Sequence, residues 1–136
     1  MKTILKCKSC FTPVTQLMEN VNKRFDMLNI IKEDEELDNG ETWVHTQYET
    51  KPNVFKLVEI QTYSHQHTSV SKIAYKMDKT MLTENVTLKE YQGCCSYDYA
   101  EIKCKCGDVI GFGRDDCWQN RSTYIYKSNV FKGGNL

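Results

Sequence analysis

The chain has 136 residues, 40% of them hydrophobic, and this length fits one domain with one core. Its 18 basic and 18 acidic residues give a net charge of zero, which excludes a general electrostatic attraction to nucleic acid or membranes. No stretch approaches a signal peptide or the roughly 20 apolar residues of a membrane span, so we expect no membrane partner. We expect an intracellular, cytoplasmic protein, with the nucleus as the other compartment.

The chain opens with Cys7 and Cys10 and continues into a segment that predicts an early helix. Thr12 and Pro13 are suited to the N-cap and the first helical position. Apolar residues then recur at helical spacing at Val14, Leu17, Met18, Val21, Phe25 and Leu28. A strand leaving the cysteine turn would also include Val14, so the start of the helix stays open.

An acidic stretch follows the predicted helix. Five of the six residues from Glu33 to Asp38 are acidic, and Asn39 and Gly40 come next. This pattern predicts an exposed acidic loop over residues 33–40, which serves as a solvated connector. A partner-binding acidic patch is the alternative interpretation.

From Thr42 onward the sequence favours β-strands. Short segments rich in Val, Ile, Thr, Tyr and Phe alternate with polar turns, and these residue types suit a pleated, half-buried surface. The segments are residues 42–48, 53–63, 69–77, 96–104, 109–113 and 122–131. Residues 133–136 are predicted to be a tail, and nothing divides the chain, so residues 1–136 form a single domain.

Two cysteine pairs lie nearly at opposite ends of the sequence. Cys7 and Cys10 have the spacing of a metal-binding turn, and Cys104 and Cys106 form a second, shorter pair. A reducing compartment and the odd total of seven cysteines argue against a disulfide framework. Four thiolates complete a closed tetrahedral zinc site, so we predict one structural Zn²⁺ shared by the two pairs.

Two further patterns bear on this site. An aliphatic residue follows each pair by four positions, Val14 after Cys10 and Ile110 after Cys106, which indicates a repeat of two zinc-bearing turns facing each other from two sheets. Inert buried thiols are the alternative. Lysines flank both pairs, which argues against deep apolar burial and favours thiolates; they are Lys6, Lys8, Lys103 and Lys105.

The second pair and its surroundings resemble the second zinc knuckle of the β-tent group, which includes the Yippee-like proteins, the ligand-binding domain of cereblon and the Mis-type centromere proteins. The matching positions are Ile102, Cys104, Cys106, Ile110, Gly111 and Phe112. Residues 7–14 match the first knuckle of the family. In the family, two residues separate the second pair of cysteines, and tryptophan stands at the position of Phe112.

The resemblance implies a mostly β fold in which two antiparallel sheets are pinned by the zinc site. It also implies a ligand-binding face, because Tyr99 and Phe112 fall where the cereblon domain has two cage tryptophans. The third cage position falls on Gly93. We therefore expect Tyr97, Tyr99 and Phe112 to contact a ligand.

Two relatives of this fold supply alternative functions. B-type methionine sulfoxide reductases place a nucleophilic cysteine where this chain has Ile125, and Cys117 lies eight residues earlier beside two acids that raise a thiol pKa. Cys94 and Cys95 could form a redox pair or remain spare thiols. A thiol-dependent reductase is therefore the weakest alternative.

The second relative is the RNA-binding carboxyl-terminal domain of the innate immune helicases. Residues 103–136 carry six basic and three acidic residues, with aromatic residues between them. Lys103, Lys105, Arg121 and Lys127 are the candidate RNA or DNA contacts. A solvated sheet face is the alternative interpretation.

The sequence thus predicts a non-catalytic, zinc-stabilised module that binds a protein partner or ligand through an aromatic-rimmed sheet face. RNA or DNA binding by the carboxyl-terminal segment stays open as the alternative.

Overall fold

The computed structural model describes residues 2–63, 69–88, 100–114 and 122–133. Within these residues the protein is built from strands, and the helical segments are three short 3-10 turns. No helix among them has the length and apolar character needed to cross a membrane. The mostly β prediction is confirmed.

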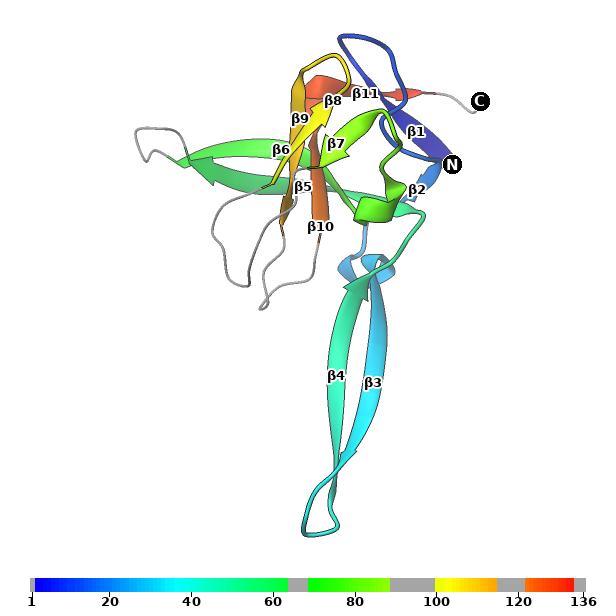
Figure 1. Ribbon diagram of the computed structural model, residues 1–136, viewed down its shortest axis with the longest axis vertical. Helices are drawn as coiled ribbons and strands as arrows, with labels where there is room; N and C mark the ends of the chain where they lie inside the picture. Colours follow the sequence, from blue (N-terminus) through cyan, green and yellow to red (C-terminus); the bar gives the residue numbers. More distant parts are fainter. Residues whose placement is uncertain (1, 64–68, 89–99, 115–121, 134–136) are drawn as a thin grey trace.

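Nine strands form one curled sheet in the order β11-β1-β2-β5-β6-β10-β9-β8-β7 (Figure 1). Their bounds are β1 Lys2–Cys7, β2 Met18–Asn20, β5 Val54–Tyr63, β6 Ser69–Met77, β7 Val86–Leu88, β8 Ala100–Cys104, β9 Val109–Arg114, β10 Ser122–Tyr126 and β11 Val130–Gly133. Neighbours are antiparallel except for β2 and β5, which are parallel. The predicted pair of sheets is therefore replaced by one curled sheet, which carries both cysteine turns.

The remaining strands, β3 Leu28–Glu36 and β4 Thr42–Thr50, pair only with each other among the described strands. Nine register pairs from Leu28↔Thr50 to Glu36↔Thr42 make a long hairpin. Figure 1 shows this hairpin projecting away from the curled sheet. We call it the arm.

The predicted early helix is wrong. Its residues instead form an isolated bridge at Thr15, strand β2, the 3-10 turn η1 Arg24–Met27 and the start of β3. Val14 and Met18 are both fully buried, and a spacing of four residues satisfies the two-residue period of an extended chain as well as a helical turn. Hydrogen bonds of the Val14 backbone to Leu5 and Thr83 hold this segment against its neighbours.

Two smaller boundaries also differ from the sequence prediction. Glu33 to Glu36 belong to β3, so the predicted acidic loop is reduced to a tight turn closed by the Gly40 N–H and the Leu37 carbonyl at 2.9 Å. Gly133, predicted to begin the tail, ends β11, and residues 134–136 lie outside the described part of the chain. The segment predicted as one strand over residues 122–131 is interrupted by the 3-10 turn η3 Lys127–Asn129.

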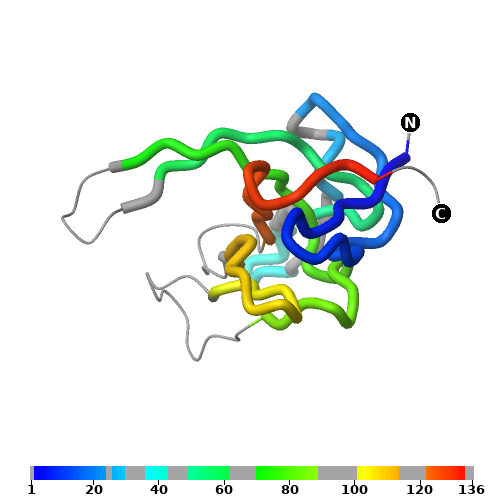
Figure 2. Tube along the Cα trace, turned by 90° about the horizontal axis from the view of Figure 1, so that it is seen from above, coloured from blue at the N-terminus to red at the C-terminus, as the bar shows by residue number. Residues whose placement is uncertain are grey.

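The largest group of buried side chains comes from most strands of the curled sheet. Figure 2 shows the backbone of these strands from above, with β1 and β11, the first and last strands, side by side. The buried group includes two cysteines from the two separate turns, Cys7 and Cys104, together with apolar residues. Its large apolar side chains are Leu5, Met18, Phe55, Tyr75, Met77, Met81, Ile102, Ile110 and Ile125. Two turns about a hundred residues apart in the sequence thus share one core.

A second buried group lies where β5, β6, β9 and β10 adjoin. Phe112 stacks on Tyr124 with ring centroids 5.0 Å apart, and Tyr126 tilts against Phe112 at 6.0 Å. Ile60 and Ala74 complete the group. We call these five residues the aromatic cluster.

Gly111 is required by the close approach of β9 to β10. A Cβ atom at this position would lie 2.0 Å from the Tyr124 carbonyl oxygen and 3.0 Å from the Ile125 Cα atom. Both neighbours are backbone atoms of a central strand, which cannot move without separating the pair Gly111↔Ile125. Only glycine fits here.

We expect Gly111→Ala to lower the free energy of unfolding by about 2–4 kcal/mol, because the added methyl group forces two paired strands apart. Gly133→Ala is the matched control, since its Cβ would meet side-chain atoms rather than backbone, namely the flexible Lys6 side chain at 2.9 Å and the Ile4 side chain at 3.1 Å. The control should cost less than about 1 kcal/mol in urea denaturation. An equal loss of unfolding free energy in the two variants would contradict the conclusion that only glycine fits at position 111.

Candidate metal centre

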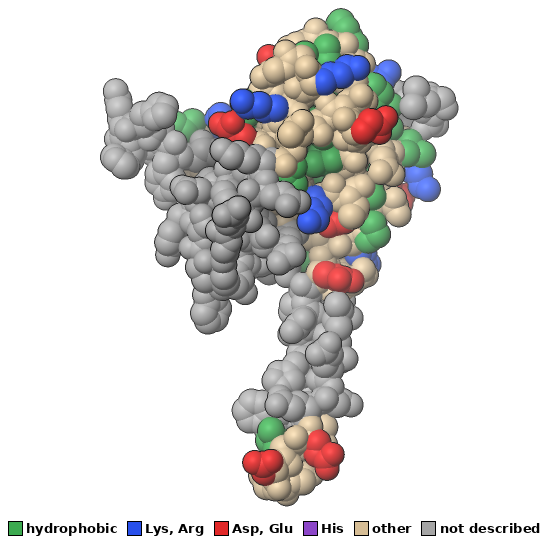
Figure 3. Space-filling view, viewed as in Figure 1, with side chains coloured by type: hydrophobic (Ala, Val, Ile, Leu, Met, Phe, Trp, Pro, Cys, Tyr) green, Lys and Arg blue, Asp and Glu red, His purple; other side chains and the backbone are tan. Residues whose placement is uncertain are grey.

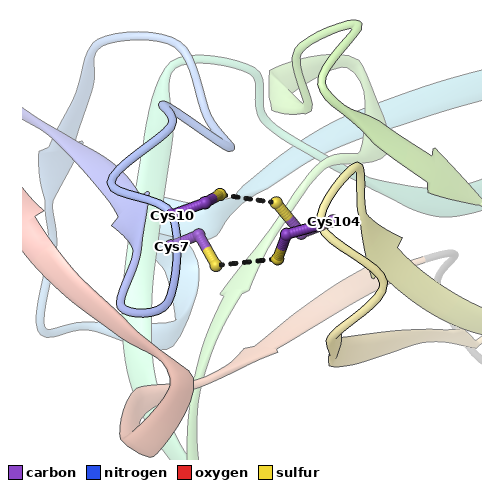
Figure 4. Close-up of side chains that lie close together, drawn as sticks. Cys7, Cys10 and Cys104 are labelled. Carbon is purple, nitrogen blue, oxygen red and sulfur yellow. Dashed lines mark hydrogen bonds between the residues drawn. The ribbon is translucent and has the colours of Figure 1, made fainter.

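Four cysteine thiols converge on one point between two turns. Cys7 ends β1 and Cys10 lies in the turn after it, while Cys104 ends β8 and Cys106 lies in the turn before β9. Their sulfur atoms all lie within 4.8 Å of one another. Figure 4 shows the side chains pointing toward a common centre from the two sides.

The spacing of the sulfur atoms fits a tetrahedral zinc ion. A Zn–S bond of about 2.3 Å places the corners of the tetrahedron about 3.8 Å apart. The Cys7 and Cys106 sulfurs are 3.7 Å apart, and those of Cys10 and Cys104 are 3.4 Å apart. The four thiols are free rather than joined as disulfides. The donor set and its geometry are therefore compatible with a four-thiolate metal site of the size that zinc requires.

The two turns have equivalent backbone structures, and we call them knuckle 1 (residues 7–12) and knuckle 2 (residues 104–108). In each, the N–H of the first cysteine donates to the carbonyl two residues beyond the second cysteine, Thr12 or Asp108, at 2.9 Å. The residue directly after the second cysteine is left-handed, with φ of 60° at Phe11 and 96° at Gly107. Its N–H donates to the carbonyl of the first cysteine at 2.8 Å in both knuckles.

The equivalence continues into the flanking strands. Lys6 pairs with Pro13, and Lys103 pairs with Val109 at the corresponding position. Val14 and Ile110 follow at the next position, and both are fully buried. The predicted repeat is therefore present in three dimensions. The single residue missing from Cys-x-Cys is removed from within the turn, so the pair next to the turn, Lys103↔Val109, still corresponds to Lys6↔Pro13. The register of β8 and β9 shifts one position further along, between Ile102 and Lys103.

Each knuckle is also held from outside. The Lys8 N–H donates to the Asn129 carbonyl at 3.0 Å, and the equivalent Lys105 N–H donates to the Asn85 carbonyl at 2.8 Å. The Ser9 hydroxyl of knuckle 1 bonds to the carboxylate of Asp108 in knuckle 2. These hydrogen bonds hold both turns in place independently of a bound metal.

Asn85 connects the two knuckles through the chain between β7 and η2 (Lys79–Met81). Its carbonyl accepts from knuckle 2, and its side-chain amide donates to the Pro13 carbonyl, beside knuckle 1, at 3.0 Å. Thr83 donates to the same Pro13 carbonyl at 2.8 Å. Sequence reasoning missed Asn85 because an asparagine in a polar turn gives no distinctive signal. Asp108 could have been found, because it lies two residues after its cysteine pair, as Thr12 does.

The surroundings of the thiols differ on the two sides of the site. Cys7 and Cys104 are buried, Cys10 is half-buried and Cys106 is exposed. Hydrogen bonding from the Thr12 side chain and backbone lowers the pKa of Cys10 to about 6, whereas burial raises the pKa of Cys104 to about 12. A dication at the centre would hold all four as thiolates, and the exposed side gives it a path of entry.

The other predicted site residues are placed as follows. Phe112 is 5% exposed and belongs to the aromatic cluster. Lys105 and Lys127 are exposed, and Lys103 forms a surface ion pair with Glu101 at 3.8 Å. Ile125, at the position of the reductase nucleophile, is fully buried in β10. Several predicted residues lie outside the described part of the chain: Gly93, Cys94, Cys95, Tyr97, Tyr99, Cys117 and Arg121.

No protein-family model and no curated protein matches this chain. The site is therefore interpreted from its own geometry.

Purified protein is expected to contain about one zinc ion per chain, because four thiolates saturate the metal. Cys104→Ser should lose the metal and unfold, since the remaining ligands no longer close the site. Cys117→Ser is the control and should keep both zinc and fold. Elemental analysis and circular dichroism measure the two properties, and a folded, metal-free Cys104→Ser protein contradicts the site.

Asn85→Ala should keep the zinc but lower the free energy of unfolding by about 1–2 kcal/mol, because the Pro13 carbonyl loses one of its two donors. A chelator should also remove zinc faster from this variant, since the knuckles are less firmly joined. Asn22→Ala, at an exposed position, is the control and should match the natural protein. Unchanged chelation and denaturation curves for Asn85→Ala would show that this bridge is dispensable.

Proposed function

We propose that this chain is a non-catalytic, zinc-stabilised binding module of the β-tent type. The observation that carries the proposal is the set of four thiols that closes around one position from two ends of the sheet. Four protein ligands leave no coordination position for substrate or water, so the metal has a structural role. A reduced, zinc-binding thiol set also suits an intracellular location.

The β-tent assignment is supported by the details of the two knuckles. That family, as the sequence resemblance implies, joins two equivalent zinc knuckles of one domain. Here the two knuckles share their hydrogen bonds, their left-handed residue and their flanking register. Gly111 and Phe112 also follow knuckle 2 in the order that the resemblance gives.

The proposed binding surface is the sheet face over the aromatic cluster, and the family resemblance adds Tyr97 and Tyr99 to the proposed contacts. Phe112 and Tyr124 stack within the cluster, and half-buried Tyr126 is its more accessible ring. The Lys72 ammonium lies 4.5 Å from the centre of the Tyr126 ring. In this proposal Phe112 supports the surface from below, and Tyr126 meets the protein partner.

We assign no catalytic role to the thiols. The residue at the reductase nucleophile position is Ile125, which has no thiol and no exposed surface. The four clustered cysteines would all serve as ligands of the one proposed metal site, so none of them is assigned as a nucleophile.

Nucleic-acid binding is the second candidate. It is favoured by the exposed ammonium groups of Lys105 and Lys127. Lys103 contributes less to a nucleic-acid-binding surface, because its charge is paired with that of Glu101.

For a protein partner isolated by affinity capture, we expect Tyr126→Ala to weaken binding by about 2 kcal/mol, because central aromatic contacts dominate interfaces. The affinity should vary little with salt. The double variant Lys105→Glu, Lys127→Glu is the control and should bind as the natural protein does.

Titrations with RNA and duplex DNA at two salt concentrations test the second candidate. For duplex DNA, log affinity falls with log salt by about 0.9 for each phosphate contact. A steep slope that the lysine variant abolishes, with Tyr126→Ala unaffected, overturns the protein-binding proposal. Zinc content and the thermal transition must be unchanged in each variant for the comparison to count.

A further inference from the structure

The charges of this neutral chain are separated between the arm and the rest of the molecule. Residues 28–50 contain seven acidic residues and a single lysine, Lys32, for a net charge of −6. The rest of the chain contains 17 basic and 11 acidic residues, for a net charge of +6. The neutral total therefore conceals two oppositely charged parts.

The arm is fixed at its base and otherwise stands apart from the sheet. Leu28 and Thr50, the first register pair, are buried, and the Thr50 and Ser122 hydroxyls lie 3.4 Å apart. The Lys51 N–H donates to the Met27 carbonyl at 2.7 Å. Beyond this base the two strands hydrogen-bond to no third strand among the described residues. An isolated two-stranded hairpin is at best marginally stable in water, so a long one is expected to have a partner surface.

The tip of the arm is exposed and acidic. Glu36, Asp38 and Glu41 are all exposed around the turn, and Asn39 accepts from the Glu41 N–H at 3.0 Å to hold that turn. Figure 3 shows carboxylates on the tip. Glu33, Asp34 and Glu35 occupy the neighbouring positions of β3.

The opposite end of the molecule carries exposed lysines. Both knuckles and η3 lie at the end away from the arm tip in Figure 1, and each contributes one exposed lysine: Lys8, Lys105 and Lys127. We call this group the knuckle end. The nearby carboxylate of Asp108 is bonded to Ser9 rather than to these lysines.

We propose that the arm binds a second copy of this chain, with the acidic tip of one copy docked on the knuckle end of the next. The two surfaces differ and lie at opposite ends, so the contact is head-to-tail and can extend beyond a dimer. Opposite charges on two well-separated surfaces both steer the encounter and hold the complex. This inference goes beyond the proposed function and does not depend on the aromatic cluster.

Salt should control this association. Exposed ion pairs are individually weak and are screened beyond about 10 Å at 0.1 M salt. The proposed contact therefore forms at low salt and high protein concentration and is lost at high salt.

The test is a charge exchange on the full-length, zinc-loaded chain, followed by sedimentation velocity at low and high salt. The tip variant is Glu36→Lys, Asp38→Lys, Glu41→Lys, and the knuckle variant is Lys8→Glu, Lys105→Glu, Lys127→Glu. The control is Glu19→Lys, Asp26→Lys, Glu59→Lys, which makes the same charge change at exposed positions outside both the arm and the knuckle end. Zinc content reports that each variant is folded, which separates this test from that of the metal site.

The natural protein and the control should sediment faster as concentration rises at low salt. Each charge-reversed variant alone should associate at least about tenfold more weakly than the natural protein, because like charges then face each other. An equimolar mixture of the two should associate again, since a positive tip meets a negative knuckle end.

Three results overturn the proposal. One is a natural protein that stays monomeric at low salt. Another is an equal loss of self-association in the tip variant and the control, because the loss would then follow from the change in net charge alone. The third is a monomer whose arm tip binds oligo-lysine, or whose knuckle end binds duplex DNA, which assigns the surface to a foreign partner. The tip lies far from the core, so the tip variant is expected to stay folded. Its association therefore tests the proposal even if the knuckle variant loses zinc.

Discussion

The convergence of four thiols is the constraint on which the rest of this structure depends. A curled sheet of nine strands leaves β11 and β7 as its two edges, and the cysteine turns lie beside these edges, at β1 and at β8. Structural zinc binding supplies roughly 10–16 kcal/mol in small modules, comparable with the whole stability of a domain. A metal bound by all four thiols would therefore join the two turns and hold the curl of the sheet, and Cys7 and Cys104 already lie within the main core.

The equivalence of the two knuckles shows how one missing residue is tolerated. Both turns end in a left-handed residue whose N–H bonds back to the first cysteine, and only the arc between these two points is shorter in knuckle 2. Glycine occupies the left-handed position there at little cost, whereas knuckle 1 places the exposed ring of Phe11 in the same conformation. The edge contact between Phe11 and Phe131, at 5.8 Å, compensates for part of that strain.

The same sheet supports two surfaces of different chemistry. The aromatic cluster lies over its central strands β5, β6, β9 and β10, where Gly111 allows β9 to approach β10 closely. The arm and the knuckle end instead carry opposite charges at the two ends of the molecule. The proposed partner of the first surface and the proposed second copy would therefore use separate surfaces.

The sequence by itself determined the class of fold and the ligands of the metal centre. Strand-forming residues from Thr42 onward predicted β4, β5, β6 and β9 nearly to the residue, because alternation and β-branching are local properties. The two cysteine pairs predicted the residues of the four-thiol cluster, because thiols at this local spacing can aim at a single metal ion. Their equivalence was visible in the positions of Val14 and Ile110.

Only the tertiary structure decided how these parts are arranged. Val14 and Met18 suit a helix and an extended chain equally well, and pairing with distant segments at Leu5 and Thr83 selected the extended form. The acidic residues predict a loop because charge favours exposure but does not set backbone conformation, and pairing with β4 places Glu33 to Glu36 in a strand instead. Strand pairing across long sequence separations sets which residues meet. It places Asn85 between the two knuckles, and it places the acidic arm and the lysines of the knuckle end at opposite ends of the molecule.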